Sequence, residues 1–227
     1  MGNYGKKFNM FKLILDKDDP TIIEIGAHYG EDSMRFIETF PRAKVYCFEP
    51  DPRNINIFKK HITDQRIKLF EVALSNKNGH SNFYQSYQEH TSKDVPDKYS
   101  WIKSDDYINK KLNASGASSL KKGYTHALKT PIKVKTERFD RWYHDNNIDK
   151  VDFVWLDTQG AEREVIEGMG TTIKNIKYIW MEYGEDLYEG AMNREETLLF
   201  MGQRGFKEVK AHSDRGYRGD VLCLNTH

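Results

Sequence analysis

The fold is decided by Thr21-Ile-Ile-Glu-Ile-Gly-Ala-His-Tyr-Gly30, followed by Tyr46-Cys-Phe-Glu-Pro-Asp-Pro52. In the first stretch an apolar run ends at Gly26, and Gly30 precedes a helical pattern. In the second, an apolar run ends at Glu49, 23 positions after Gly26. This layout is typical of the first strand-helix-strand unit of a sheet that binds a nucleoside-containing cofactor.

The glycine spacing narrows the class of ligand. Gly26 and Gly30 form a Gly-x-x-x-Gly pattern, which lacks the third glycine of the dinucleotide pattern and hence an obvious cradle for a diphosphate. We therefore expect a nucleoside without a diphosphate. Glu49 has two acceptor oxygens for two ribose hydroxyls. The alternative is a tight strand-helix turn followed by a solvated glutamate.

Composition limits the other classes of function. The 227 residues suffice for a single domain spanning residues 1–227, and 35 Lys and Arg against 34 Asp and Glu leave a net charge of +1. No overall field attracts nucleic acid or an anionic membrane. No apolar run is long enough for membrane insertion, and the first residues lack the apolar segment of a signal peptide. Cys47 and Cys223 lie in apolar runs, which predicts buried thiols in a cytoplasmic protein.

Apolar runs alternate with helical patterns along the chain, which predicts an α/β fold with a parallel sheet covered on both faces. We expect seven strands, at Thr21–Ile25, Lys44–Glu49, Ile67–Ala73, Val151–Leu156, Tyr178–Glu182, Phe206–Lys210 and Val221–Asn225. We expect helices at Asp32–Phe40, Arg53–His61, Arg138–Asn146, Ala161–Met169 and Arg194–Arg204. Asn193 and Glu196 predict a capping box for the last helix.

The alternation breaks between residues 75 and 135. This segment is polar but contains Tyr84, Tyr87, Tyr99, Trp101, Tyr107 and Tyr124. It follows the third strand, so it should lie over the carboxyl edge of the sheet, where α/β folds bind ligands. We interpret it as an acceptor-binding lid. The alternative is a flexible insertion with incidental aromatic residues.

A second set of chemical groups follows the run that starts at Val151. The strand ends at Asp157, Gly160 allows a tight turn, and Glu162 lies in the first turn of the next helix. An acid that ends a buried strand needs a partner, which makes Asp157 a candidate functional group. Glu162 has an alternative explanation, because acids near a helix N-terminus are stabilised by the helix dipole.

Together these motifs resemble the FkbM-type S-adenosylmethionine-dependent methyltransferases. The resemblance covers roughly residues 21 to 182. It rests on Glu24-Ile-Gly-Ala-His-Tyr-Gly30, Phe48-Glu-Pro-Asp-Pro52, Ala73-Leu-Ser75 with Gly79, Gly116-Ala-Ser-Ser-Leu120, Val134-Lys-Thr-Glu-Arg-Phe-Asp140 and Val151-Asp-Phe through Gln159-Gly-Ala-Glu162. Single motifs are weak, but six in the family's order are specific.

The resemblance implies a class I methyltransferase fold, a Rossmann-like seven-stranded sheet whose last strand is antiparallel, and methylation of a hydroxyl oxygen. By resemblance, the methionine part of S-adenosylmethionine lies against Glu24, Gly26, Ala27, His28 and Gly30. Glu49 holds the ribose with Pro50 and Asp51 beside it, Ala73 and Leu74 flank the adenine, and Asp157 lies near the sulfonium. The chain departs from the family's usual residues at His28, Phe139 and Gln159.

The catalytic candidates are Asp157, which we favour as general base, and then Glu162, with His90 and His126 as rivals. Candidate acceptor-binding residues are Ser118, Ser119, His126 and Glu182. We assign no metal; the alternative is a Mg²⁺ ion held by Asp157, Glu182, Glu185 and Asp186.

The expected acceptor is a sugar, a glycan or another hydroxylated small molecule, because tyrosine-rich surfaces present both apolar faces and polar groups. The same side chains can stack on bases, so RNA is the alternative acceptor, although we expect no nucleic acid. Two further alternatives are an NAD-type oxidoreductase and a non-catalytic binding domain. The sequence does not identify the acceptor or the oligomeric state.

Overall fold

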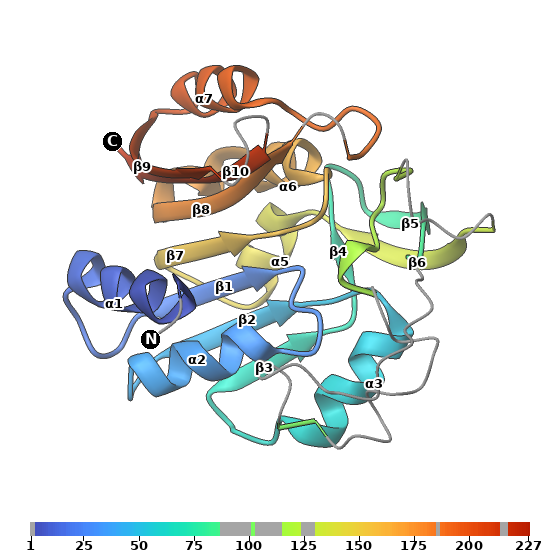
Figure 1. Cartoon of the computed structure of the whole chain (residues 1–227), viewed down its shortest axis with the longest axis horizontal. Helices are drawn as coiled ribbons and strands as arrows, with labels where there is room; N and C mark the ends of the chain where they lie inside the picture. The colour runs from blue at the N-terminus through green and yellow to red at the C-terminus, as the bar shows by residue number, and fades with distance from the viewer. Residues whose placement is uncertain (1–2, 87–100, 103–114, 124–129, 185–186, 214–217) are drawn as a thin grey trace.

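Seven strands form one sheet in the computed structural model, which describes residues 3–86, 101–102, 115–123, 130–184, 187–213 and 218–227 (Figure 1). The order across the sheet is β3-β2-β1-β7-β8-β10-β9. The bounds are β1 Thr21–Ile25, β2 Lys44–Phe48, β3 Ile67–Phe70, β7 Val151–Leu156, β8 Ile176–Gly184, β9 Phe206–Ser213 and β10 Arg218–Asn225. The last strand, β10, runs antiparallel to both of its neighbours. The predicted sheet is confirmed.

The centre of the sheet explains the apolar runs of the sequence. Strand β1 pairs in parallel with β2 on one side and with β7 on the other. Almost every residue of β1 and β7 is buried, as expected for parallel strands covered on both faces. Because β2 and β7 flank β1, the segments that follow all three strands meet at one edge.

Helices cover both faces of the sheet. On one face, α1 (Asn3–Leu15) and α2 (Glu31–Thr39) pack against Phe153 and Trp180 in one apolar cluster (Figure 1). On the other face, a second cluster joins α5 (Phe139–Asp145), α6 (Glu162–Met169) and α7 (Arg194–Gly202) to Val154 and Met181. Helix α3 (Pro52–His61) follows β2, and the short 3₁₀ helix η3 (Gly170–Asn175) follows α6.

The predicted capping box of α7 is confirmed. Asn193 accepts a hydrogen bond from the Glu196 main-chain amide at 2.9 Å, and the Glu196 carboxylate accepts one from the Asn193 amide at 3.1 Å. Both predicted thiols, Cys47 and Cys223, are free and buried. Within the described residues, no helix combines the length and apolar character needed to cross a membrane.

A second, smaller sheet was not predicted. It consists of β4 (Ala73–Leu74), β6 (Ile132–Glu137) and β5 (Gly79–Phe83), in that order. The predicted strand Ile67–Ala73 is therefore wrong at its end. The chain bends after Phe70, whose carbonyl accepts a 3.0 Å hydrogen bond from the Val72 amide, and Ala73 pairs with β6 instead.

Candidate functional site

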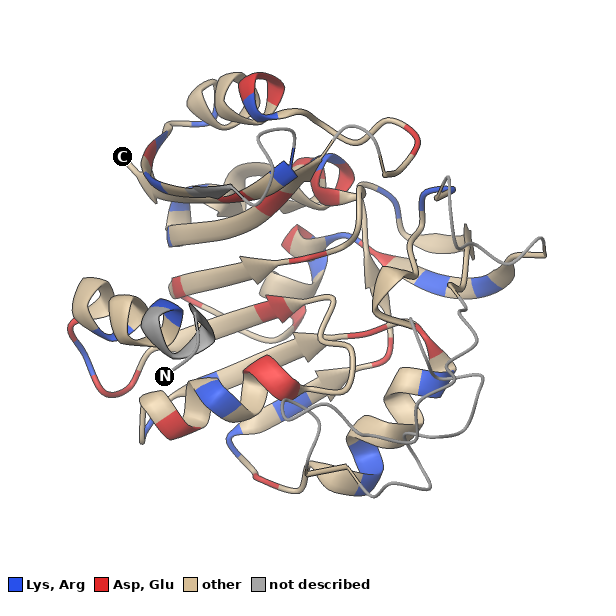
Figure 2. Cartoon of the chain, in the orientation of Figure 1, with Lys and Arg blue, Asp and Glu red and all other residues tan. Residues whose placement is uncertain are grey.

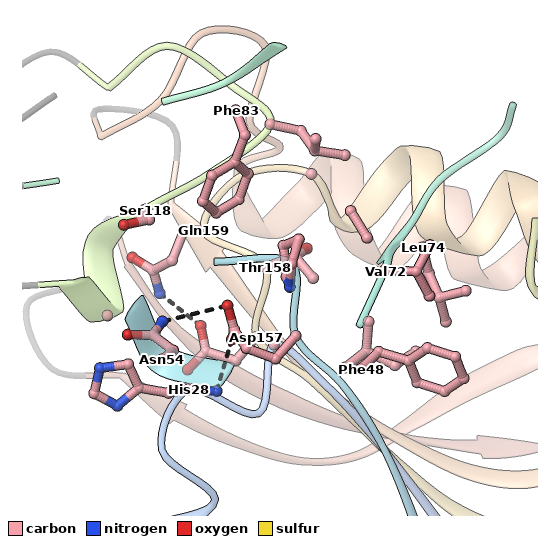
Figure 3. A pocket seen from close by; sticks show the side chains of 18 of the residues that line it. His28, Phe48, Asn54, Val72, Leu74, Phe83, Ser118, Asp157, Thr158 and Gln159 are labelled. Atoms are coloured by element: carbon pink, nitrogen blue, oxygen red, sulfur yellow. Dashed lines mark hydrogen bonds between the residues drawn. The ribbon is translucent and has the colours of Figure 1, made fainter. Parts of the chain in front are cut away.

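A cavity opens at the carboxyl ends of β1, β2 and β7 (Figure 3), with about 520 Å³ of empty space when the open solvent at its mouth is included. Several residues predicted for the cofactor or the acceptor line it: Gly26, His28, Glu49, Pro50, Ala73, Leu74, Ser118 and Asp157. Apolar walls come from Phe48, Val72, Phe83, Leu120 and Ala161. Concave sites with apolar walls and a few polar groups are typical of small-molecule binding.

The turn after β1 approaches the neighbouring turn very closely. Gly26 has φ 88°, and a Cβ atom there would lie 1.9 Å from the main-chain oxygen of Asp157. Gly30 also has a positive φ, 87°, and a Cβ there would collide with Phe58 and Ile62. Both positions therefore favour glycine: Gly26 for the close approach of the two turns and Gly30 for its packing against Phe58 and Ile62.

Glu49 is a buried carboxylate at the end of β2, with 4% of its surface exposed. The main-chain amides of His28 and Asp51 each donate a hydrogen bond of 2.8 Å to it, and Asn54 Nδ2 donates another at 3.3 Å. Burial raises the pKa of Glu49 to about 7 against the effect of these donors. A ligand that donates hydrogen bonds would favour the charged form.

His28 connects the turn that follows β1 to the segment around Ser115. Its Nδ1 lies 3.1 Å from Glu31 Oε1, and its Nε2 lies 2.9 Å from Ser115 Oγ. The imidazole also packs against the Tyr29 ring, with ring centroids 3.6 Å apart and the ring planes tilted by 31°. His28 therefore fixes one wall of the cavity.

Asp157 belongs to a polar network centred on Gln159. The Gln159 amide donates a hydrogen bond to Asp157 Oδ1 at 2.5 Å (Figure 3). It donates another to Glu182 Oε2 at 2.9 Å. The Tyr188 hydroxyl lies 2.7 Å from Gln159 Oε1. Burial raises the pKa of Asp157, and burial together with the Asp157 charge raises the pKa of Glu182 to about 10. Glu182 therefore keeps its proton at neutral pH.

Glu162 does not line the main cavity. It is buried at the start of α6, and its Oε1 accepts hydrogen bonds from the amide and the hydroxyl of Thr158 at 2.9 and 3.0 Å. With Glu182 and Tyr188 it borders a second, smaller pocket. Burial raises the pKa of Glu162 to about 7.

Other predicted residues support the site from outside the main cavity. Glu24 is buried and accepts a hydrogen bond from Ser33, while burial raises its pKa well above the ordinary value. Asp51 caps α3 and pairs with Arg53 at 2.6 Å. Ser119 Oγ donates to the Thr158 carbonyl at 3.2 Å. Ala27, Gly30 and Glu182 are likewise absent from the lining of the main cavity.

The candidates His90, His126, Glu185 and Asp186 lie outside the described residues, as does most of the predicted lid. The described parts of residues 75–135 contribute Phe83, on β5, and Ser115, Gly116, Ser118 and Leu120 to the main cavity. Sequence reasoning missed Phe83 and also Asn54. The alternating pattern around Phe83 is too weak to predict a buried aromatic residue. Asn54 is one of several polar residues on its helix, so nothing in the sequence marks it as a residue that lines a cavity.

No group of three or more His, Cys, Asp or Glu side chains arranged to hold a metal is found in the part of the chain that the structure describes. The Gln159 amide lies between Asp157 and Glu182, the two described members of the alternative Mg²⁺ site. Amide hydrogens directed at both carboxyl groups do not form a cation site in this arrangement.

Comparisons with solved structures identify the fold. A Clostridium thermocellum protein named as a proposed rRNA methylase superimposes with a TM-score of 0.53 at 13% identity, covering 100% of this chain and 97% of the other. Fibrillarin from Aeropyrum pernix with bound S-adenosyl-L-methionine gives 0.50 at 12% identity, covering 92% and 67%. At these identities the likeness concerns the fold alone.

Comparisons with sequences identify the family. The methyltransferase FkbM domain matches residues 24–217. The 2-O-methyltransferase NoeI of Sinorhizobium fredii (strain NBRC 101917 / NGR234) is 34% identical over 215 residues, which are 94% of this chain and 82% of the relative. The methyltransferase sdnD of Sordaria araneosa is 22% identical over 162 residues, 66% of this chain and 61% of the relative. The predicted enzyme class, an S-adenosylmethionine-dependent O-methyltransferase, is confirmed, and the chain belongs to the FkbM methyltransferase family.

Proposed function

We propose that this enzyme binds S-adenosylmethionine in the cavity at the ends of β1, β2 and β7 and methylates a hydroxyl of a sugar, a glycan or a similar hydroxylated small molecule. The observation that carries the proposal is the placement of two carboxylates, Glu49 and Asp157, on the wall of one cavity. They follow β2 and β7, the strands on either side of β1. At the usual spacing of roughly 4.8 Å between neighbouring strands, these two strands lie about 10 Å apart.

The charge distribution supports a cationic ligand. Figure 2 shows acidic residues on the central strands of the sheet. The pKa of Glu182, on β8, is raised to about 10, so this side chain adds no negative charge at neutral pH. Asp157 adds a carboxylate that reaches the cavity itself. An acidic environment favours a sulfonium, whereas the diphosphate of a dinucleotide would be repelled.

The protein has two tasks in the reaction. S-adenosylmethionine supplies the reactive methyl group, so the site must orient the acceptor hydroxyl and accept one proton. Asp157 is the proposed general base, because it lines the cavity and because its raised pKa makes the carboxylate a stronger base toward the acceptor hydroxyl. Glu162 is the weaker candidate, because its described contacts hold it against Thr158.

The acceptor class is supported by the relative and by the lid. NoeI is named as a 2-O-methyltransferase, which favours a hydroxyl acceptor for this chain. The tyrosine-rich sequence between residues 75 and 135 suits a sugar ring. A cytoplasmic location and a lid function for this segment remain part of the proposal.

A methyl-transfer assay tests this function. Incubating the enzyme with S-adenosylmethionine labelled in the methyl group and a panel of sugars, glycans and RNA should label a hydroxylated sugar. Asp157→Asn should lower kcat by about 100-fold or more, the usual contribution of a general base, while S-adenosylhomocysteine still binds. We expect turnover to persist in excess EDTA.

Three outcomes would contradict the proposal. Label found only in RNA would overturn the acceptor class, and full activity of Asp157→Asn would overturn the assigned base. Activity lost in EDTA and restored by Mg²⁺ would show that a metal is required.

A further inference from the structure

Asn54, whose side chain lines the main cavity, carries a buried polar atom that has no partner among the described residues. It lies in the first turn of α3, lines the cavity, and has 2% of its surface exposed (Figure 3). Its Oδ1 has no hydrogen-bond partner among the described residues. Leaving a buried acceptor unpaired is unfavourable, so a ligand donor is the expected partner.

The orientation of the Asn54 amide is fixed by its neighbour. Asn54 Nδ2 lies 3.3 Å from Glu49 Oε1. Only the nitrogen of the amide can donate to a carboxylate, so the reverse orientation would place two acceptors against each other. The unpaired atom is therefore the oxygen.

Glu49 has little remaining capacity for ligand hydrogen bonds. A carboxylate oxygen accepts about two of them. Glu49 Oε1 already accepts from the Asp51 amide at 2.8 Å and from Asn54 Nδ2 at 3.3 Å. Among the donors that the structure describes, Oε2 accepts from the His28 amide, at 2.8 Å. The side chain can thus take one further donor, on Oε2, and not the two ribose hydroxyls expected from the sequence.

We propose that the ribose of the cofactor is shared between two residues, with one hydroxyl donating to Glu49 Oε2 and the other to Asn54 Oδ1. The inference rests on the proposed function, because it assumes that the cavity holds the nucleoside. The two acceptors belong to side chains already joined by a hydrogen bond. A vicinal diol supplies two donors on adjacent carbons, which matches this pair better than a single hydroxyl does.

Calorimetric titrations with S-adenosylhomocysteine and its 2′-deoxy and 3′-deoxy analogues test the proposal. We expect both analogues to bind the wild type less tightly than the parent. Asn54→Ala should weaken the parent about 10-fold, corresponding to one hydrogen bond. It should leave the affinity for one of the two deoxy analogues unchanged, because the hydroxyl that contacts Asn54 is already missing from that analogue.

Matched variants separate contact from indirect effects. Asn56→Ala changes an exposed asparagine on the same helix and should bind all three ligands like the wild type. Where Asn54→Ala does not fold, Asn54→Ser, which suits the first turn of a helix, is titrated instead.

The proposal would be overturned if the Asn54 variant lost the same factor for all three ligands, as expected if Asn54 only positions Glu49. It would also be overturned by unchanged affinity for all three. Failure of the wild type to bind S-adenosylhomocysteine would instead overturn the proposed function, so the two failures are distinguishable.

Discussion

At the residue scale, Gln159 holds two carboxyl groups together by donating a hydrogen bond to each. Asp157 faces the cofactor cavity, while Glu182 lies behind the amide with its pKa raised to about 10. A neutral acid beside Asp157 avoids a second negative charge in a buried site. We infer that the amide and the protonated Glu182 together keep Asp157 in place.

Glu182→Gln should become progressively more stable than the wild type as the pH rises from 5 to 9. The unfolded chain loses the Glu182 proton near its ordinary value of 4.5, but the folded chain keeps it up to about 10. The stabilising contribution of this group is therefore complete below pH 4.5 and declines as the pH rises toward 10. Glutamine has no proton to lose. Chemical denaturation at several pH values measures the difference.

The exposed Glu189 supplies the control for this experiment, since Glu189→Gln should differ from the wild type by a constant amount. A pH-independent difference for Glu182→Gln as well would show that Glu182 is ionised in the folded enzyme. In that case a protonated Glu182 would not help to keep Asp157 in place.

At the element scale, the turns that follow β1 and β7 are packed in direct contact. We expect Gly26→Ala to lower the free energy of unfolding by at least about 2 kcal/mol, because of backbone strain and a collision with the Asp157 carbonyl. The same change should abolish detectable binding of S-adenosylhomocysteine. Thermal unfolding and calorimetry measure the two effects.

Gly202→Ala is the matched control. No atom lies within 4 Å of a Cβ at this position in α7, so alanine should keep or increase stability by up to about 1 kcal/mol. If Gly26→Ala were as stable as the wild type and bound S-adenosylhomocysteine as tightly, the two turns would not require close contact.

The sequence predicted the main sheet well because its strands are buried on both faces. Strands β1 and β7 match the predicted bounds, since their apolar runs end at turn residues. The small sheet was missed because β5 has only one buried residue, Phe83, and depends on pairing with β6. Helix α1 was also missed, although Phe8, Phe11 and Leu15 recur at helical spacing on its buried face.

At the scale of the whole molecule, the cavity is assembled from segments far apart in the sequence. The main sheet supplies Gly26, Glu49 and Asp157, while the small sheet and the segment after residue 114 supply Phe83 and Leu120. The strand-end residues were predictable, because strand order and direction bring them to one edge. The others were not, because their positions depend on pairing between β5 and β6 and on contacts with residues 115–120.

We propose that this cavity is the S-adenosylmethionine site and that Glu49 holds the ribose. Calorimetric titration of S-adenosylhomocysteine into the wild type and Glu49→Ala tests it most directly. We predict one binding site in the wild type and an affinity at least about 10-fold lower in the variant, because hydrogen bonds to a charged acceptor are worth roughly 1.5–3 kcal/mol. Equal affinity for the two proteins would contradict the claim.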